Sequence, residues 1–180
     1  MTMQENTLIL IKPDAYRRRL TGEILRRFEA AGLAISSIRV SIDEVDLTEA
    51  HYPRDADWLA TVGGKTLEDY QSMGFSTSQS LGTEDPLEIG KIIRGRLVTF
   101  LQSGPVIPAV LSGNRAIQNV RKLVGATLPV FAAPGTIRGD LSSDSTDFAN
   151  SEERPVENLI HASGDPAEAE REIALWFHTN

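Results

Sequence analysis

Four side chains in the C-terminal third of the chain combine chemistry suited to phosphate groups with a nucleophile. The stretch 134–140 reads Pro-Gly-Thr-Ile-Arg-Gly-Asp and supplies Arg138, and the stretch 158–163 supplies Asn158, His161 and Ser163. A guanidinium is a planar fork of donors that fits phosphate oxygens. A neutral imidazole offers a nitrogen nucleophile near physiological pH. The combination favours phosphoryl transfer through a covalent histidine intermediate.

The elements that position these side chains begin with two strands and a helix. Within residues 7–12, both the even-numbered and the odd-numbered positions carry apolar side chains, which suits a strand covered on both faces. A helix capped by Thr21 follows and stops at Gly32. Residues 33–40 indicate a second strand, and their apolar parity changes across 36–37, which allows a bulge there.

The middle of the chain has a less regular pattern. A short helix is expected over 47–52, and residues 53–84 hold enough apolar side chains for a small helical packing unit. A capping box, Asp-Pro-Leu-Glu, begins a helix that runs to Gln102. Residues 106–111 indicate a third strand, in which Pro108 predicts an edge position or a bulge.

The last third contains two helices, a polar segment and a short strand. Asn114 is expected to cap a helix that ends at Gly125, and residues 141–157 are polar and loop-like. Residues 159–160 suit a short final strand, and a second capping box opens a helix with an apolar face over 166–176. This order of elements predicts an α+β fold with a sheet packed on one side by helices.

Composition narrows the classes of protein that the chain can belong to. Its 180 residues suit one domain, and its formal net charge of −7 argues against a general nucleic-acid binder. The absence of cysteine excludes disulfides and thiolate metal sites. The longest apolar run is far below the ~20 residues of a membrane span, and the polar start is unlike a signal peptide. We therefore expect a cytoplasmic protein with neither a nucleic-acid nor a membrane partner.

Five segments, in order, resemble the nucleoside diphosphate kinase family. They are 11–14, 103–106, 121–127, 134–140, and 158–161 with the following 169–173. Each segment alone is weak evidence for the family, but the five in this order are specific for it and cover most of the chain. The resemblance implies a ferredoxin-like α+β sandwich, an antiparallel sheet packed by helices, that assembles into homo-oligomers. It implies a single domain over 1–180, with long inserted segments at about 53–92 and 141–157.

The resemblance also implies a reaction. Enzymes of this family move the γ-phosphate of a nucleoside triphosphate, such as ATP or GTP, to a nucleoside diphosphate in a ping-pong mechanism through phosphohistidine. Mg²⁺ is the expected cofactor, carried on the nucleotide phosphates and not held by a dedicated set of protein ligands.

Catalytic roles carry over to five positions. His161 matches the family nucleophile, Glu172 the carboxylate that orients it, and Ser163 a hydroxyl beside it. Lys12 matches the lysine at the transferring phosphate, and Tyr52 the tyrosine that packs near the histidine. On spacing alone Glu172 would be a solvated helix residue. The other two histidines are expected to matter less: His51 is placed on a helix surface, and His178 at a frayed terminus.

The resemblance assigns nucleotide-binding roles to a second set of residues. Arg121 and Arg138 match the arginines that grip the phosphates, and Thr127 and Asn158 match polar contacts to phosphate and ribose. Ile93 stands where the family has an aromatic residue that stacks on the base. Because base stacking is worth about 1–3 kcal/mol, base affinity is expected to be weaker, unless Phe75 or another inserted aromatic substitutes.

Two departures leave alternatives open. The family run His-Gly-Ser-Asp is here His-Ala-Ser-Gly-Asp over 161–165, and the two inserted segments are long. The alternatives are a nucleotide-binding regulatory module with weak or no phosphotransfer, and a protein-histidine phosphotransfer role. A further motif, Gly-Gly-Lys-Thr over 63–66, resembles the end of a P-loop, but Leu59 stands where that motif needs glycine. We discount it.

Overall fold

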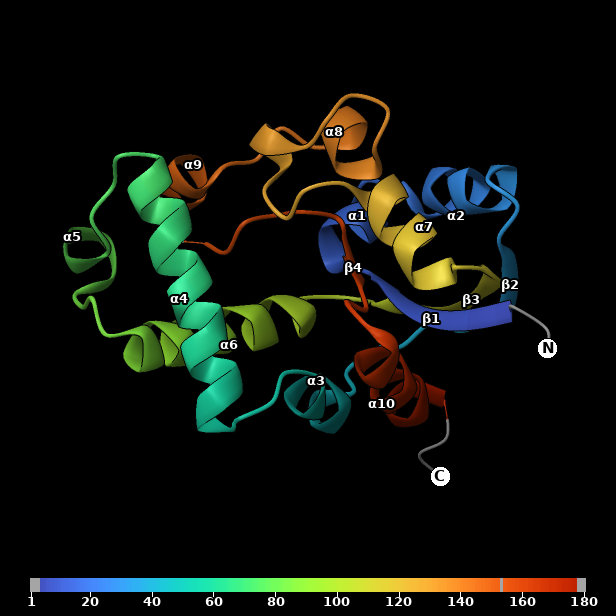
Figure 1. The fold of residues 1–180 in the computed structure, drawn as a ribbon, viewed down its shortest axis with the longest axis horizontal. Helices are drawn as coiled ribbons and strands as arrows, with labels where there is room; N and C mark the ends of the chain where they lie inside the picture. The colour runs from blue at the N-terminus through green and yellow to red at the C-terminus, as the bar shows by residue number, and fades with distance from the viewer. Residues whose placement is uncertain (1–3, 153, 178–180) are drawn as a thin grey trace.

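A four-stranded antiparallel sheet organises the protein (Figure 1). The computed structural model describes residues 4–152 and 154–177. The strands are β1 (Gln4–Ile11), β2 (Ala34–Ile38), β3 (Ile107–Asn114) and β4 (Ile160–Ala162). Their order in the sheet is β2-β3-β1-β4. In β1, Leu10 pairs with His161 of β4. The sheet therefore places His161 beside the end of β1, where Lys12 follows.

Helices cover both faces of this sheet, and not one face as the order of elements predicts (Figure 1). The helices are α1 (Pro13–Arg17), α2 (Thr21–Ala30), α3 (Val45–His51), α4 (Ala56–Ser72), α5 (Thr77–Leu81), α6 (Pro86–Leu101), α7 (Ala116–Val124), the 3₁₀ turn η1 (Pro129–Phe131), α8 (Ile137–Leu141), α9 (Thr146–Ser151) and α10 (Pro166–Phe177). Within the described residues, no helix combines the length and apolar character needed to cross a bilayer.

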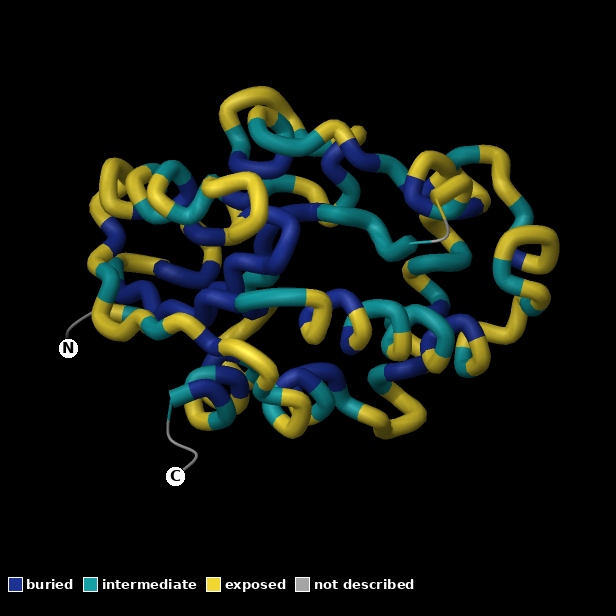
Figure 2. Tube along the Cα trace, turned by 180° about the vertical axis from the view of Figure 1, so that it is seen from behind, coloured by how far each residue is buried: buried dark blue, intermediate teal, exposed yellow. Residues whose placement is uncertain are grey.

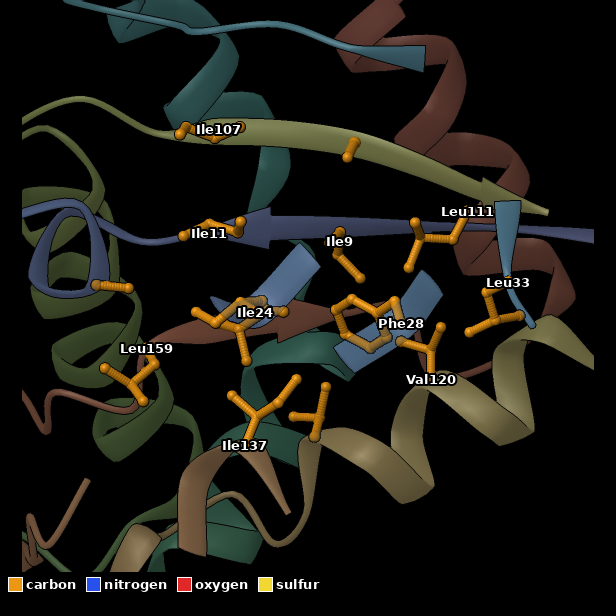
Figure 3. Close-up of a cluster of buried hydrophobic side chains, with 14 of the residues drawn as sticks. Ile9, Ile11, Ile24, Phe28, Leu33, Ile107, Leu111, Val120, Ile137 and Leu159 are labelled. Carbon is orange, nitrogen blue, oxygen red and sulfur yellow. The ribbon is translucent and has the colours of Figure 1, made fainter. Parts of the chain in front are cut away.

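The core divides according to the alternation of side chains along β1. Ile9 and Ile11 enter a cluster with α2 and α7, in which Ile24 and Phe28 are fully buried (Figure 3). Leu8 and Leu10 enter a second cluster, which includes residues of α6 and α10. A strand whose consecutive side chains are all apolar buries both faces, as predicted for residues 7–12. Figure 2 shows buried residues gathered toward the middle of the molecule and exposed residues at the outer turns.

Several local predictions are corrected by tertiary context. β3 is an interior strand, so the edge position inferred from Pro108 is wrong. The Pro108 carbonyl accepts from the N–H of Arg39, just beyond the end of β2, and the pairing continues to a bridge between Ser41 and Val106. The proline therefore removes one donor from this side of β3 without ending the pairing. The expected bulge at 36–37 is confirmed as a register shift between Ile35 and Ser37.

Helix starts and the polar segment also differ from expectation. Thr21 is the first helical residue of α2, and Leu20 precedes it without a side-chain cap. Asn114 ends β3, and Arg115, with a φ of 46°, precedes α7. The segment 141–157, expected to be loop-like, contains α9, which Ser145 caps by accepting from the N–H of Phe148. A capping serine begins this short helix despite the polar composition.

The segment 53–84 forms a helical unit beside the sheet, as its apolar residues suggest. α4 packs across α6 with Gly63 and Gly90 at the crossing. A Cβ at Gly63 would overlap the carbonyl of Pro86, and a Cβ at Gly90 would overlap the carbonyl of Leu59. The two helices thus meet backbone to backbone. The Gly-Gly-Lys-Thr motif lies inside α4 and is part of a helix crossing, not a P-loop.

Candidate active site

The backbone before His161 is held in an unusual conformation. Leu159 is fully buried with a φ of 68°, a left-handed value that costs energy for a branched side chain. The backbone N–H of Leu159 donates to the Asp14 carboxylate at 2.9 Å. The backbone carbonyl of Leu159 accepts from the N–H of Lys12 at 2.9 Å. The turn after β1 therefore fixes the strand that carries His161.

The His161 ring faces a buried carboxylate. Both oxygens of Glu172, on α10, lie 3.0 Å from His161 Nε2, and Ser163 Oγ donates to Glu172 Oε2 at 2.6 Å. Glu172 is 1% exposed, whereas the His161 side chain retains 18% exposure. Burial lowers the pKa of His161, and the positive charge of Lys12 lowers it further. The imidazole is thus neutral and positioned, while one side stays open to solvent.

His51 is the main residue of the cleft that sequence reasoning missed. Predicted on a helix surface, it is 1% exposed, and its ring lies 4.5 Å from that of His161 at 88°. Trp176 Nε1 donates to His51 Nδ1 at 3.3 Å. Burial lowers the pKa of His51 well below 6.5, so its ring is neutral. A signal was present: His51 follows Leu47 by one helical turn and shares its apolar face.

A lysine and an asparagine connect three segments at the centre of the site. Lys12 Nζ donates to Asn158 Oδ1 at 2.7 Å, and Asn158 Nδ2 donates to the Thr127 carbonyl at 2.9 Å. Burial lowers the pKa of Lys12 to about 8, and the nearby charge of Arg138 contributes in the same direction. The ammonium is therefore poorly solvated, a condition that strengthens its attraction for an anion.

Arg138 is used differently from a free phosphate-binding arginine. Its guanidinium donates to four backbone carbonyls, those of Asn158, Ile160, Gly125 and Ala126, at distances from 2.6 to 3.1 Å. Burial lowers its pKa to about 10. Since a guanidinium has five N–H donors, one N–H remains for a ligand. Arg138 ties the segment carrying His161 to the loop after α7.

Arg121 contrasts with Arg138. It is exposed on the last turn of α7, and its guanidinium makes no hydrogen bond or ion pair within the part of the chain that the structure describes. Its charge is close enough to lower the pKa of Arg138. A cation that has no protein partner at the edge of a cleft is available for an anionic ligand.

Most predicted site residues line a single cleft of about 420 Å³. The structure brings together in its lining Lys12, Tyr52, Arg121, Thr127, Arg138, Asn158, His161 and Glu172, and adds His51 and Glu168. Ser163 is buried behind Glu172 and acts on the cleft only through that carboxylate. Ile93 lines an adjoining cavity of about 310 Å³. Phe75 is exposed after α4 and lines neither, and His178 lies outside the described residues.

The donor set of the cleft indicates where a metal ion would fit. Ligand atoms of His51, His161 and Glu172 lie within 4.8 Å of one another, a grouping that spacing did not predict. The Glu172 oxygens, however, already accept hydrogen bonds from His161 and Ser163. Of the charged side chains around the rest of the cleft, all but Glu168 are cationic, which suits phosphate and disfavours a bare divalent cation. A Mg²⁺ ion would fit this cleft only if phosphate oxygens of a ligand supplied most of its ligands.

Comparisons with known proteins identify the family. The model for nucleoside diphosphate kinase matches residues 5–58 and 88–180. A nucleoside diphosphate kinase from Pyrobaculum aerophilum is 50% identical over 173 residues, covering 96% of this chain and 94% of the relative. A nucleoside diphosphate kinase from Mycobacterium tuberculosis is 38% identical over 176 residues, covering 97% of this chain and 98% of the relative.

Solved structures agree with these relatives. The crystal structure of an NDP kinase from Pyrobaculum aerophilum superposes with a TM-score of 0.90 at 49% identity, covering 97% of this chain and 96% of that one. A second structure is a transition-state mimic of nucleoside-diphosphate kinase from Borrelia burgdorferi with bound vanadate and ADP. It gives a TM-score of 0.76 at 32% identity, covering 98% of this chain and 89% of that one. The ferredoxin-like α+β fold is thereby confirmed.

The fold and the cleft define a phosphotransferase that acts on nucleotides. The chain belongs to the nucleoside diphosphate kinase family. Residues 59–87, which include most of α4 and all of α5, lie between the two matched ranges of the family model.

Proposed function

We propose that the enzyme transfers the γ-phosphoryl group of a nucleoside triphosphate to a nucleoside diphosphate in two half-reactions, through phosphohistidine at His161. The observation that carries the proposal is the contact between His161 Nε2 and Glu172. A carboxylate partner assigns the proton to Nε2 and leaves the lone pair on Nδ1. Nδ1 is therefore the proposed nucleophile.

Each half-reaction exchanges one bond to phosphorus for another. Nδ1 attacks the γ-phosphorus, the bond to the β,γ-bridging oxygen breaks, and its electron pair leaves with the nucleoside diphosphate. The ring becomes cationic, and the Glu172 carboxylate stabilises that charge, as in other triads. A terminal oxygen of the second diphosphate then attacks the same phosphorus, and the P–N bond breaks with its electron pair returning to Nδ1.

The cationic side chains have distinct proposed tasks. Lys12 neutralises charge on the transferring group, and Arg121 supplies an unpaired guanidinium to the outer phosphates. Arg138 contributes its charge and one free N–H while holding the backbone around His161. Mg²⁺ on the nucleotide would neutralise phosphate oxygens. Thr127 and Asn158 are proposed contacts to phosphate and ribose.

Tyr52, Ser163 and Ile93 have supporting tasks. The Tyr52 ring lies 4.7 Å from that of His51 and packs behind the nucleophile. Ser163 keeps Glu172 in place by its hydrogen bond. Ile93 offers an aliphatic surface to the base in the adjoining cavity.

The state of the protein in solution is also a proposal. We infer a cytoplasmic homo-oligomer of single domains spanning 1–180, with 53–92 and 141–157 as inserted segments and no nucleic-acid or membrane partner. Support for self-assembly comes from exposed apolar side chains on and after the edge strand β2. These are Ile38, Val40, Ile42 and Val45, each about half exposed. Sedimentation analysis would test it, since a monomer at micromolar concentration contradicts it.

Labelling with γ-³²P nucleotide tests the reaction. The expected result is rapid acid-labile labelling of His161, removed by any nucleoside diphosphate, and no labelling of His161→Gln. A protein that binds nucleotide but stays unlabelled would support the regulatory alternative. Label that passes to proteins and not to nucleotides would support a protein-histidine phosphotransfer role. Full nucleotide exchange by His161→Gln would overturn the mechanism.

A further inference from the structure

The catalytic cleft continues into a second cavity that has a different character. The two share Lys12, Val62, Lys65, Leu97, Thr127 and Asn158 in their linings. Beyond that boundary the lining of the 310 Å³ cavity includes apolar side chains such as Ile93, Val156 and Tyr70, with polar side chains between them. A polar cleft for phosphates joined to a more apolar cavity has the layout of a nucleotide, with the base in the second part.

One wall of this second cavity comes from α4. Val62, Lys65, Thr66, Asp69 and Tyr70 all line it. They fall within residues 59–87, which the family model does not match. The wall is therefore a feature of this chain and of relatives that share the segment, and the general family pattern does not predict what it recognises.

The wall is rigidly placed. At Gly63 and Gly90 the backbones of α4 and α6 meet, and no side chain separates them. Lys65 and Asp69 follow the crossing on one face of α4, four residues apart. The carboxyl and ammonium groups are thus presented by a fixed helix and not by a loop.

We propose that Asp69 and Lys65 read the hydrogen-bonding edge of the nucleobase and favour guanine nucleotides over adenine and pyrimidine nucleotides. The inference rests on the proposed function of the adjoining cleft. It adds polar recognition to the aliphatic surface that Ile93 offers the base.

Donor and acceptor positions explain the preference for guanine. An ionised carboxylate only accepts hydrogen bonds, and guanine offers it two parallel donors, N1–H and the 2-amino group. Lys65 can donate to the guanine O6. Adenine offers one amino group and places the lone pair of N1 toward the carboxylate. Pyrimidines have one ring and reach less far from the ribose.

Two observations support Asp69 as the acceptor. Its carboxylate accepts no hydrogen bond from any described residue, so its lone pairs are available to a ligand. Although the residue as a whole is exposed, burial of its carboxyl group raises its pKa, with Glu68 adding to the effect. Part of the carboxyl is thus turned from bulk solvent in a residue that lines the cavity.

The test compares kcat/KM for GDP and ADP as phosphate acceptors. In the unaltered enzyme we expect GDP to be favoured by about tenfold, the low range for one bidentate base contact. Asp69→Asn should bring the ratio to one or below, because the amide loses an acceptor for guanine and gains a donor for the adenine N1. Glu68→Gln is the matched control, because it removes the same charge from the same helix at an exposed position outside the lining. It should leave the ratio intact.

Binding separates this inference from the proposed reaction. Calorimetric Kd values for GDP and ADP, measured on His161→Gln, do not require phosphotransfer. A guanine preference that Asp69→Asn abolishes in this background supports base reading even if labelling of His161 fails. Equal affinity for GDP and ADP, or equal changes from Asp69→Asn and Glu68→Gln, would overturn the inference.

Discussion

His161 and Glu172 face each other so that Nε2 lies 3.0 Å from both carboxylate oxygens. The same carboxylate accepts from Ser163 Oγ at 2.6 Å and is 1% exposed. Because a buried carboxylate is costly unless it is hydrogen-bonded, Ser163 and His161 keep Glu172 in one position. We propose that Glu172 in turn sets the tautomer and orientation of the ring.

Replacing that carboxylate should slow the chemical step. We expect Glu172→Gln to lower the rate of His161 phosphorylation by about 10- to 100-fold, the usual loss when a partner that orients an imidazole is removed. Rapid-quench measurement of the first turnover checks it. Glu170→Gln, on the exposed face of α10, is the control and should leave the rate unchanged. Equal rates for both variants would contradict the orienting role.

The two arginines of the cleft should respond differently to the same substitution. Arg138→Lys cannot reproduce four carbonyl contacts, so we expect a loss of about 2–4 kcal/mol in the free energy of unfolding, together with a loss of activity. Arg121→Lys should weaken nucleotide binding while the unfolding free energy stays the same. Urea denaturation and calorimetric titration with nucleotide measure the two effects. The idea fails if both variants lose stability equally.

Lys12 makes activity and stability depend on pH in opposite directions. Its pKa in the fold is about 8, against 10.5 for an ordinary lysine. As pH rises through about 8 the free enzyme loses the ammonium charge, so kcat/KM should fall. Between pH 8 and 10.5 the unfolded chain binds more protons at this site, so the contribution of Lys12 to stability should rise.

A charge that does not titrate provides the control for Lys12. Lys12→Arg should be slower overall but should keep its activity flat above pH 8, because guanidinium stays protonated. Steady-state profiles from pH 6 to 10 compare the two proteins. A profile for the unaltered enzyme that stays level up to pH 10 would rule out the depressed pKa.

His51 should matter for stability as well as for rate. His51→Phe keeps an aromatic ring beside His161 but leaves the buried Trp176 N–H without an acceptor. We expect a loss of about 1–3 kcal/mol in the free energy of unfolding and slower phosphorylation of a less firmly packed His161. Denaturant titration and labelling measure these effects. An exposed His51 on a helix surface would predict no change in either.

Adjacent glycines in α4 offer a matched pair of substitutions. Gly63→Ala places a methyl group against the Pro86 carbonyl and should force α4 away from α6, lowering stability and the affinity for the base. Gly64→Ala meets nothing within 4 Å and should stabilise the helix by up to about 1 kcal/mol. Thermal unfolding of both variants measures the difference in stability. Similar melting temperatures would show that the close crossing is not required.

Local patterns were sufficient for several of the regular elements and for the residues with strong chemistry. Short stretches of chain were enough to recognise three kinds of feature. These are the apolar run at 7–12, the capping boxes at 85–88 and 165–168, and the cations and imidazole at 12, 138 and 161. Strand propensity, helix capping and the reactivity of a side chain are properties of a few neighbouring residues, so they can be read without a fold.

The burial of His51, the contact of Glu172 with His161 and the α4 wall of the second cavity were decided only by tertiary structure. Residues 51, 161 and 172 come from α3, β4 and α10, and their meeting depends on how these elements pack on the sheet. Pro108 shows the same limit, since its place in an interior strand depends on which segments pair with β3 on its two sides. Desolvation and contact distance between distant segments are properties of the packed chain, and no local pattern contains them.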